Sequence, residues 1–167
     1  MAFMLPHIRA LSGSFNVQVL ANTRDGALLQ ERGVDVVIDQ VPVVRRIAPW
    51  EDLKALWILY FRFKRDVPSA VHTITPKAGL LGMMAAWLAR VPVRVHSFTG
   101  QVWVTRSGPM RWLLKLADKC IVVMATDVLV DSPSQRAFLV EQGIVACLLY
   151  TSPSPRDYAA SRMPSSA

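Results

Sequence analysis

Residues 71–82, VHTITPKAGLLG, decide the fold class, because a strand ends and a helix begins within them. The short apolar run at 70–73 predicts a strand, and the Thr-Pro pair at 75–76 predicts the start of a helix. That helix extends over 76–88 and is rich in small and apolar residues, and the branched run at 93–98 predicts the next strand. This order of strand, helix and strand is typical of parallel βαβ units.

The alternation of helices and strands extends in both directions from this stretch. On the amino-terminal side we expect helices at 3–11 and 49–64, a short helix ending at 30–33, and strands at 15–21 and 34–41. On the carboxyl-terminal side we expect helices at 110–125 and 132–143 and a strand at 128–131. Together these elements predict an α/β fold with a Rossmann-like, doubly wound parallel sheet covered by helices on both faces.

One feature departs from a complete domain of this class. Such folds normally begin with a strand, whereas the first element expected here is a helix. We therefore expect a leading strand to be missing, and in a Rossmann-like order it would lie in the middle of the sheet. The isolated chain is then expected to be unstable or to aggregate, and a cooperative thermal transition would contradict this expectation.

The composition fits one soluble or surface-bound globular domain. Of the 167 residues, 52% are hydrophobic and 19% are charged, and no apolar run reaches the roughly 18 residues that a membrane span needs. The formal charge of +7 favours phosphate-bearing ligands or anionic lipid surfaces, and the chain has no motif that would indicate a nucleic-acid partner. Cys120 and Cys147 make no disulfide framework, and the amino end lacks a signal-peptide pattern, which fits a cytoplasmic setting.

Several enzyme classes lose their sequence support because their motifs are absent. The chain contains no G-x-G-x-x-G, no G-x-x-x-x-G-K-[ST], no G-x-S-x-G and no paired metal-ligand spacing. A dinucleotide enzyme, a P-loop enzyme, an α/β-hydrolase and a metalloenzyme are therefore disfavoured.

Residues 147–167 differ in composition from the rest of the chain. They are rich in Ser, Pro and Ala and have no period that would bury a face, which predicts a disordered tail. In addition, CLLYTSPSPRD resembles the in-frame translation of a transposon-derived sequencing-library adaptor, and SRMPSSA resembles the far end of that adaptor. We therefore expect residues 1–146 to form an incomplete Rossmann-like domain and residues 147–167 to be a non-native tail.

The candidate site follows from the predicted sheet. Ligands of open parallel sheets bind at the carboxyl ends of the strands, so the residues that matter lie at 72–79, 96–103 and 131–136. In the first junction Thr75 can cap the helix, and the N–H groups near Lys77 can then face an anion or a sugar hydroxyl. A cap without any ligand is the more common role of such a threonine.

The other candidates also have a structural alternative. His72 and His96 can carry protons or bind a sugar, but a lone histidine at the end of a strand is more often packed and hydrogen-bonded. Gln101 after Gly100 suits a hydroxyl-rich ligand, or the glycine only makes a turn. Ser132 has a clear structural role as an N-cap, and a ligand role is the weaker interpretation.

The predicted helix at 49–64 interleaves aromatic and basic residues. Such a helix can press on an anionic bilayer, although core packing is the more common role of most of these aromatics. The residues concerned are Trp50, Trp57, Tyr60, Phe61 and Phe63, with Lys54, Arg62, Lys64 and Arg65.

Three segments together resemble the amino-terminal half of bacterial family 4 glycosyltransferases that extend lipid-linked or lipopolysaccharide glycans. They are FMLPHIRAL at 3–11, VHTITPKAGLLGMMAAWLARVPVRVHSFTGQVW at 71–103 and VLVDSPSQRAFLVEQGIV at 128–145. The resemblance covers nearly all of residues 3–145, and its central segment is the most specific. It implies the GT-B architecture, in which a first Rossmann-like domain binds the acceptor and a second binds a nucleotide-sugar donor.

The resemblance also implies roles for particular residues. It places Thr75, Lys77 and Gly79 at the first loop of the cleft, Thr99, Gly100 and Gln101 at the second, and Ser132 and Gln135 at the third. Many relatives have a histidine just before the glycine of the second loop, where this chain has Thr99, so a histidine contact to the donor sugar is not expected at that position.

The implied reaction is transfer of a sugar with retention of configuration, without a bound metal and with the nucleotide sugar as a substrate rather than a cofactor. The donor-binding half, with its paired glutamates, is absent from this sequence, so this chain alone is expected to be inactive. The implied partners are a nucleotide sugar and a lipid-linked or saccharide acceptor, with contact to the inner face of the cell membrane. Two alternatives stay open, a Rossmann-type nucleotide-sugar epimerase and a non-catalytic binding module.

Overall fold

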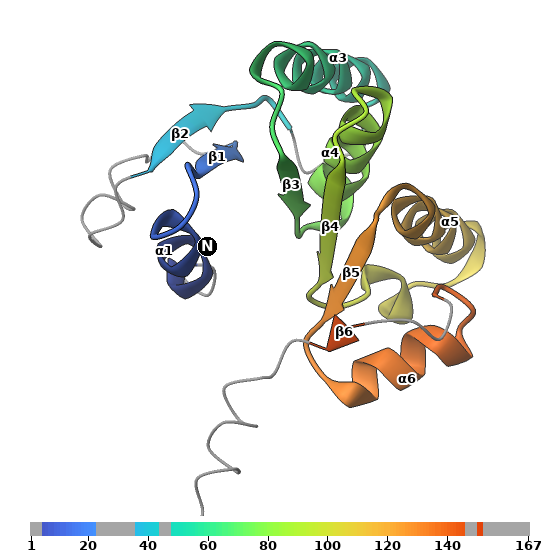
Figure 1. Cartoon of the computed structure of the whole chain (residues 1–167). Coiled ribbons are helices and arrows are strands. Elements are labelled where there is room, and N and C mark those ends of the chain that lie inside the picture. Colours follow the sequence, from blue (N-terminus) through green and yellow to red (C-terminus); the bar gives the residue numbers. More distant parts are fainter. Residues whose placement is uncertain (1–4, 23–35, 44–47, 146–149, 152–167) are drawn as a thin grey trace, which may run out of the picture. The chain divides into compact units, whose positions relative to one another are not determined.

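A computed structural model describes residues 5–22, 36–43, 48–145 and 150–151 of the chain. The chain divides into two compact units, Met1–Ala55 and Leu56–Ala167, with the boundary inside one helix. Figure 1 shows the described elements of both units, coloured along the sequence.

The first unit contains a helix and a small parallel sheet. Helix α1 (Leu5–Ser12) precedes strand β1 (Gln18–Ala21), which pairs with β2 (Val37–Gln40). Val36 is buried among side chains from α1 and both strands, namely Ile8, Val17, Val19 and Ile38. Val17 and Val19, like Val36 and Ile38, are two residues apart, so their side chains point to the same face of the sheet, which can therefore pack on the helix.

Helix α3 (Pro49–Asp66) contains the boundary between the two units. It begins with proline, has Glu51 and Asp52 in its first turn, and ends with Lys64 and Arg65 in its last turn, as the helix dipole favours. The sequence prediction of this helix is therefore confirmed.

The second unit is a four-stranded parallel sheet with helical connections. Along the chain it contains β3 (Ala70–Thr73), α4 (Pro76–Leu88), β4 (Val93–Phe98), the 3-10 helix η2 (Val102–Thr105), α5 (Gly108–Met124), β5 (Asp127–Val130), α6 (Pro133–Glu141) and β6 (Tyr150–Thr151). The strand order is β3-β4-β5-β6, and every neighbouring pair is parallel. The predicted α/β class with parallel strands is therefore confirmed.

The helices α4, α5 and α6 pack on the same face of this sheet. Phe98, Val128 and Val130 point to one face, and they form a buried cluster with Leu139 of α6. Ile121 of α5 forms a second buried cluster with residues of α4. Successive crossovers between neighbouring parallel strands are right-handed, so they place their helices on one face. Figure 1 shows α4 and α5 together on one side of the strands.

Some predictions need correction or stay outside the described residues. The expected tail contains strand β6, which pairs with the edge of β5, because an edge strand offers free backbone groups to any extended segment. The 3-10 helix η2 lies between β4 and α5, where the sequence predicted no helix. The predicted short helix ending at 30–33 lies outside the residues that the structure describes.

Candidate functional site

The three predicted loops begin at one edge of the four-stranded sheet. Thr73, at the end of β3, lies opposite His96, and Phe98, at the end of β4, lies opposite Val130 of β5. Because the three strands are parallel, the loops that follow them leave the sheet at the same edge. The structure therefore brings the first, second and third junctions to one side of the second unit.

The first loop leads into α4 without a side-chain cap. Thr75 has the extended backbone of an N-cap residue and Pro76 follows it, but the Thr75 side chain makes no capping hydrogen bond. The first N–H groups of a helix have no partner inside the helix, and they carry the positive end of its dipole. The start of α4 is thus suited to an anion or a hydroxyl-bearing ligand. Thr75 is exposed and Lys77 is half-buried.

The third loop is closed by its own side chains. The Ser132 hydroxyl oxygen accepts a hydrogen bond from the backbone N–H of Gln135 at 3.2 Å, which confirms its N-cap role. The Gln135 side-chain oxygen in turn accepts from the backbone N–H of Asp131 at 2.8 Å. Burial raises the pKa of the Asp131 carboxyl above its usual value. The polar groups at the start of α6 are therefore largely used in local structure.

His96 is a buried positioning residue. The residue is 1% exposed, its Nδ1 lies 2.7 Å from the Thr73 hydroxyl oxygen, and its ring forms a T-shaped pair with the Phe98 ring. Burial, and then the charge of His72, lower the pKa of His96 to about 4, so the ring is neutral at neutral pH. The imidazole therefore links β3 to β4 and is not accessible to a ligand.

Gly79 explains how α4 approaches this histidine. A Cβ atom placed on Gly79 would lie 2.7 Å from His96 Cε1, closer than side chains tolerate. The glycine therefore lets the first turn of α4 lie directly on the imidazole ring. Sequence reasoning assigned Gly79 to the first loop of the cleft, and the structure places it buried beneath that loop.

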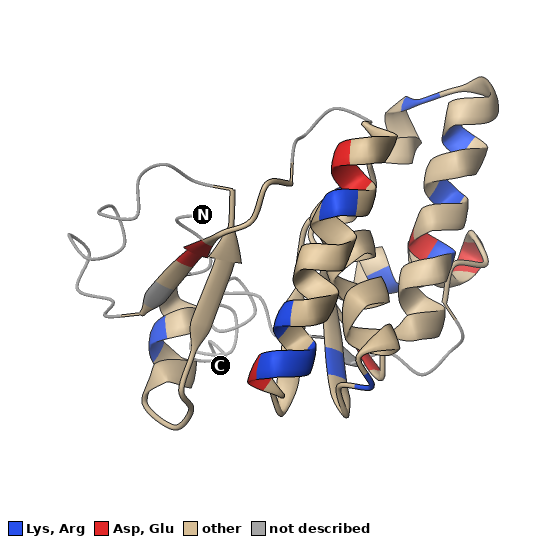
Figure 2. Cartoon of the chain, turned by 90° about the horizontal axis from the view of Figure 1, so that it is seen from above, with Lys and Arg blue, Asp and Glu red and all other residues tan. Residues whose placement is uncertain are grey.

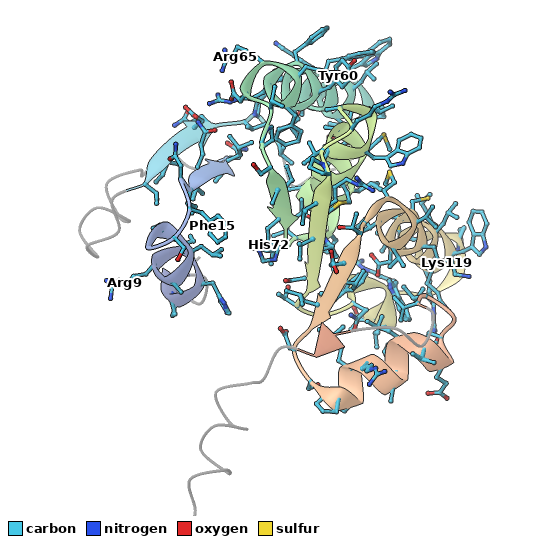
Figure 3. All side chains as sticks on the ribbon, viewed as in Figure 1. Arg9, Phe15, Tyr60, Arg65, His72 and Lys119 are labelled. Atoms are coloured by element: carbon cyan, nitrogen blue, oxygen red, sulfur yellow. The ribbon has the colours of Figure 1, made fainter. Side chains whose placement is uncertain are left out.

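His72 lies on the other face of the sheet. Neighbouring residues of a strand point to opposite faces, so His72 faces away from Thr73 and from α4. Its Nε2 lies 2.7 Å from the Ser97 hydroxyl oxygen, and its side chain is exposed. Figure 3 labels His72 at the strands of the second unit. The two candidate histidines are therefore separated by the sheet.

The second loop combines an exposed turn with a buried anchor. Thr99 and Gly100 are exposed, and Gly100 has a φ of +134°, a conformation that L side chains rarely adopt. Gln101 is half-buried, and its Nε2 is a buried nitrogen without a hydrogen-bond partner among the described residues. This amide is the group of the loop whose hydrogen-bonding capacity is unused within the described chain.

Trp103 anchors the second loop in the core. Its ring is 1% exposed, it stacks on Phe138, and its indole N–H donates to the Asp118 carboxylate at 2.7 Å. Burial raises the pKa of Asp118, while the hydrogen bond from Trp103 acts in the opposite direction. Sequence reasoning missed this pair, because a tryptophan and an aspartate fifteen positions apart give no local signal.

The described residues bear on two further features, a metal centre and a membrane span. No three His, Cys, Asp or Glu side chains in the described ranges lie together as metal ligands would. None of the described helices is long and apolar enough to cross a bilayer.

One known protein family matches the chain over this fold and over the edge of the sheet where the three loops begin. Residues 7–148 match the family described as a glycosyl transferase 4-like domain. The match covers most of the chain and all three loops, so the chain belongs to this family.

Two curated proteins illustrate the similarity. The chain is 30% identical over 129 residues to the capsular polysaccharide biosynthesis glycosyltransferase CapM of Staphylococcus aureus, which covers 77% of this chain and 34% of that protein. It is 36% identical over 81 residues to the UDP-Gal:alpha-D-GlcNAc-diphosphoundecaprenol alpha-1,3-galactosyltransferase of Escherichia coli, which covers 46% of this chain and 21% of that protein. The chain therefore spans about a third or less of the length of these relatives.

Proposed function

We propose that this chain is the acceptor-side domain of a glycosyltransferase that acts, with retention, on a nucleotide-sugar donor and a lipid-linked or saccharide acceptor. The observation that carries the proposal is the family match over residues 7–148, which includes the whole edge of the sheet where the loops meet. Both relatives are named as glycosyltransferases, and the name of the Escherichia coli protein specifies a diphosphoundecaprenol acceptor.

The start of α4 is the proposed contact for the phosphate groups of such an acceptor. An acceptor lipid with a diphosphate carries negative charge, and the uncapped helix start offers N–H donors and a positive dipole end. Lys77, in the first turn, adds a positive charge. In the second loop, the half-buried Gln101 side chain is the proposed contact for a sugar hydroxyl.

In the proposed reaction the acceptor hydroxyl oxygen forms a bond to the anomeric carbon of the donor sugar. The bond from that carbon to the nucleotide phosphate oxygen breaks, and the hydroxyl proton leaves with a base or with the departing diphosphate. His96 is too buried and its pKa too low to take this proton at neutral pH, so its role is to hold the loop edge in place. The proposal includes no metal ion or cofactor.

The proposed setting is the cytoplasmic side of the cell membrane, with the protein bound peripherally. A lipid-linked acceptor stays in the bilayer, so the domain that binds it must reach the membrane surface. The net charge of +7 favours approach to anionic headgroups.

The test is a transfer assay on the gene product expressed at the length of its relatives. Membranes that contain undecaprenyl-diphosphate-linked sugar are incubated with each of several radiolabelled nucleotide sugars. We expect label to enter the lipid fraction from one donor. Label found only in an epimerised nucleotide sugar would support the epimerase instead. Acceptor binding without transfer from any donor would support a binding module.

A further inference from the structure

Helix α5 has an apolar stripe that the second unit leaves exposed. Trp112, Leu116, Cys120 and Val123 recur at intervals of three or four residues, so they share one side of the helix. Trp112 is 68%, Leu116 40% and Val123 83% exposed, and Cys120 is also exposed. A contiguous apolar stripe in water indicates an interaction surface.

The opposite side of α5 is packed in the core, and this packing keeps the apolar stripe facing outward. Ile121 is fully buried and packs with Met83 of α4 and with Met124. Asp118 is bonded to the buried Trp103 indole. Because α5 is held on its inner side by these contacts, the helix cannot turn the stripe inward without breaking its core.

A row of basic residues borders the stripe. Arg111, Lys115 and Lys119 are four residues apart and therefore lie along one flank of α5. Arg111 and Lys115 lie over the Trp103 ring, and Lys115, which is half-buried, also donates to the Gln142 side-chain oxygen at 3.0 Å, whereas Lys119 is exposed. Asp118, the single acidic residue of α5, is buried. Figure 2 shows blue basic segments repeated along this helix, and Figure 3 labels Lys119 on it. The exposed surface of α5 is thus apolar in the middle and positive at its flank.

We propose that α5 docks on an anionic lipid bilayer, with Trp112, Leu116 and Val123 in the headgroup region and Lys119 against the lipid phosphates. An exposed apolar face with a basic border is the pattern of helices that lie in a membrane interface. A second copy of the chain is disfavoured as the occupant, because it would bring two positive rows together. The inference deepens the proposed membrane contact, but its test requires no sugar transfer, so the two proposals can fail separately.

Helix α3 is the competing surface and is less suited to this role. Trp50, Trp57 and Phe61 are 85%, 49% and 64% exposed, which corrects the expectation that most aromatics of this helix pack in the core. The reason is that the buried positions of α3, among them Phe63, form a narrow stripe. However, its basic residues are partly neutralised, because Arg62 and Arg65 both pair with Asp66, at 3.0 Å and 2.8 Å.

The test is flotation with vesicles of the gene product expressed at the length of its relatives, because aggregated protein sinks and bound protein floats. Vesicles of phosphatidylcholine alone are compared with vesicles that also contain phosphatidylglycerol. We expect binding only to the anionic vesicles, and we expect Lys119→Glu and the Trp112→Ser, Val123→Ser double variant each to weaken it about tenfold or more.

Matched controls keep the test specific. Arg9→Glu on α1 makes the same change in charge, and Val140→Ser on α6 removes an exposed apolar side chain elsewhere, so both should bind as the wild type does. The proposal is wrong if the wild type does not float with anionic vesicles, or if the controls weaken binding as much as the α5 variants. It is also wrong if only Trp57→Ser on α3 abolishes binding, or if the chain binds an acidic protein and no vesicle.

Discussion

Helices α4 and α6 begin alike in sequence and differ in structure. Thr75-Pro76 precedes α4 and Ser132-Pro133 precedes α6, and both starts lie at the same edge of the sheet. The Ser132 hydroxyl caps its helix and Gln135 closes the loop, whereas the Thr75 hydroxyl makes no cap bond. The difference shows that the same local pattern supplies a side-chain cap at one strand end and none at the next.

The cause of the difference lies below the helix starts. The fourth residue of α4 is Gly79, which lies on the buried His96 ring, and the fourth residue of α6 is Arg136. The start of α4 is therefore positioned from beneath by packing on the imidazole, and it does not need a side chain above it. The start of α6 is positioned by its own Ser132 and Gln135.

The largest effect is expected from Gly79→Val. The new side chain would clash with His96, whose ring is packed between β3, β4 and α4, so the free energy of unfolding should fall by about 3 kcal/mol or more. Arg136→Ala, at the matching position of α6, should cost less than about 1 kcal/mol. Both losses in the free energy of unfolding are measured by denaturant unfolding, in a form of the protein that unfolds cooperatively. Equal losses would show that the two helix starts are supported in the same way.

The next effect is a dependence of stability on pH through His96. Its folded-state pKa of about 4 lies below the ordinary value of 6.5, so between these pH values the unfolded chain binds a proton that the folded chain does not. Stability should therefore fall as the pH drops from 6.5 toward 4, by up to about 3 kcal/mol, and this group should have no effect above pH 6.5.

The measurement is denaturant unfolding at several pH values for the wild type and His96→Asn. The variant lacks the titrating ring, so its curve should be flatter between pH 6.5 and pH 4 than that of the wild type. If the two curves have the same slope, another group causes the dependence and the buried, neutral state assigned to His96 is wrong.

A smaller effect on stability is expected at the two residues that precede the helices, Ser132 and Thr75. Ser132→Ala removes a capping hydrogen bond and should lower the free energy of unfolding by about 1 kcal/mol. Thr75→Ala removes no such bond and should leave stability within about 0.5 kcal/mol of the wild type. Unfolding curves for the two variants measure the difference. A loss for Thr75→Ala as large as that for Ser132→Ala would mean that Thr75 is a structural cap.

The sequence predicted the elements around the first loop to the residue. The bounds expected for 70–73, 76–88 and 93–98 are those of β3, α4 and β4, because a strong apolar run and a Thr-Pro pair leave few alternatives. The first strand was predicted at 15–21 and is shorter, Gln18–Ala21. Phe15, which is 67% exposed, lies outside the pairing of Gln18–Ala21 with Val37–Gln40.

The site was only partly predictable. The order of the strands was enough to assign the three loops to one edge. The contact of His96 with Thr73 depends on the register between two strands, and the Trp103 to Asp118 bond depends on the fold of η2 and α5. Neither contact leaves a local pattern in the sequence. Sequence reasoning therefore treated His72 and His96 as equal candidates, although His96 is buried and His72 is exposed.

The most direct measurement for the central claim is sugar transfer by the gene product at the length of its relatives, with and without Lys77→Gln. We predict transfer from a nucleotide sugar to a diphosphate-linked lipid acceptor, and a KM for that acceptor about tenfold higher in Lys77→Gln, with Arg9→Gln on α1, which also removes one positive charge, as the unchanged control. No transfer from any nucleotide sugar would contradict the proposed function. Transfer with an unchanged acceptor KM in Lys77→Gln would contradict the role of the α4 start.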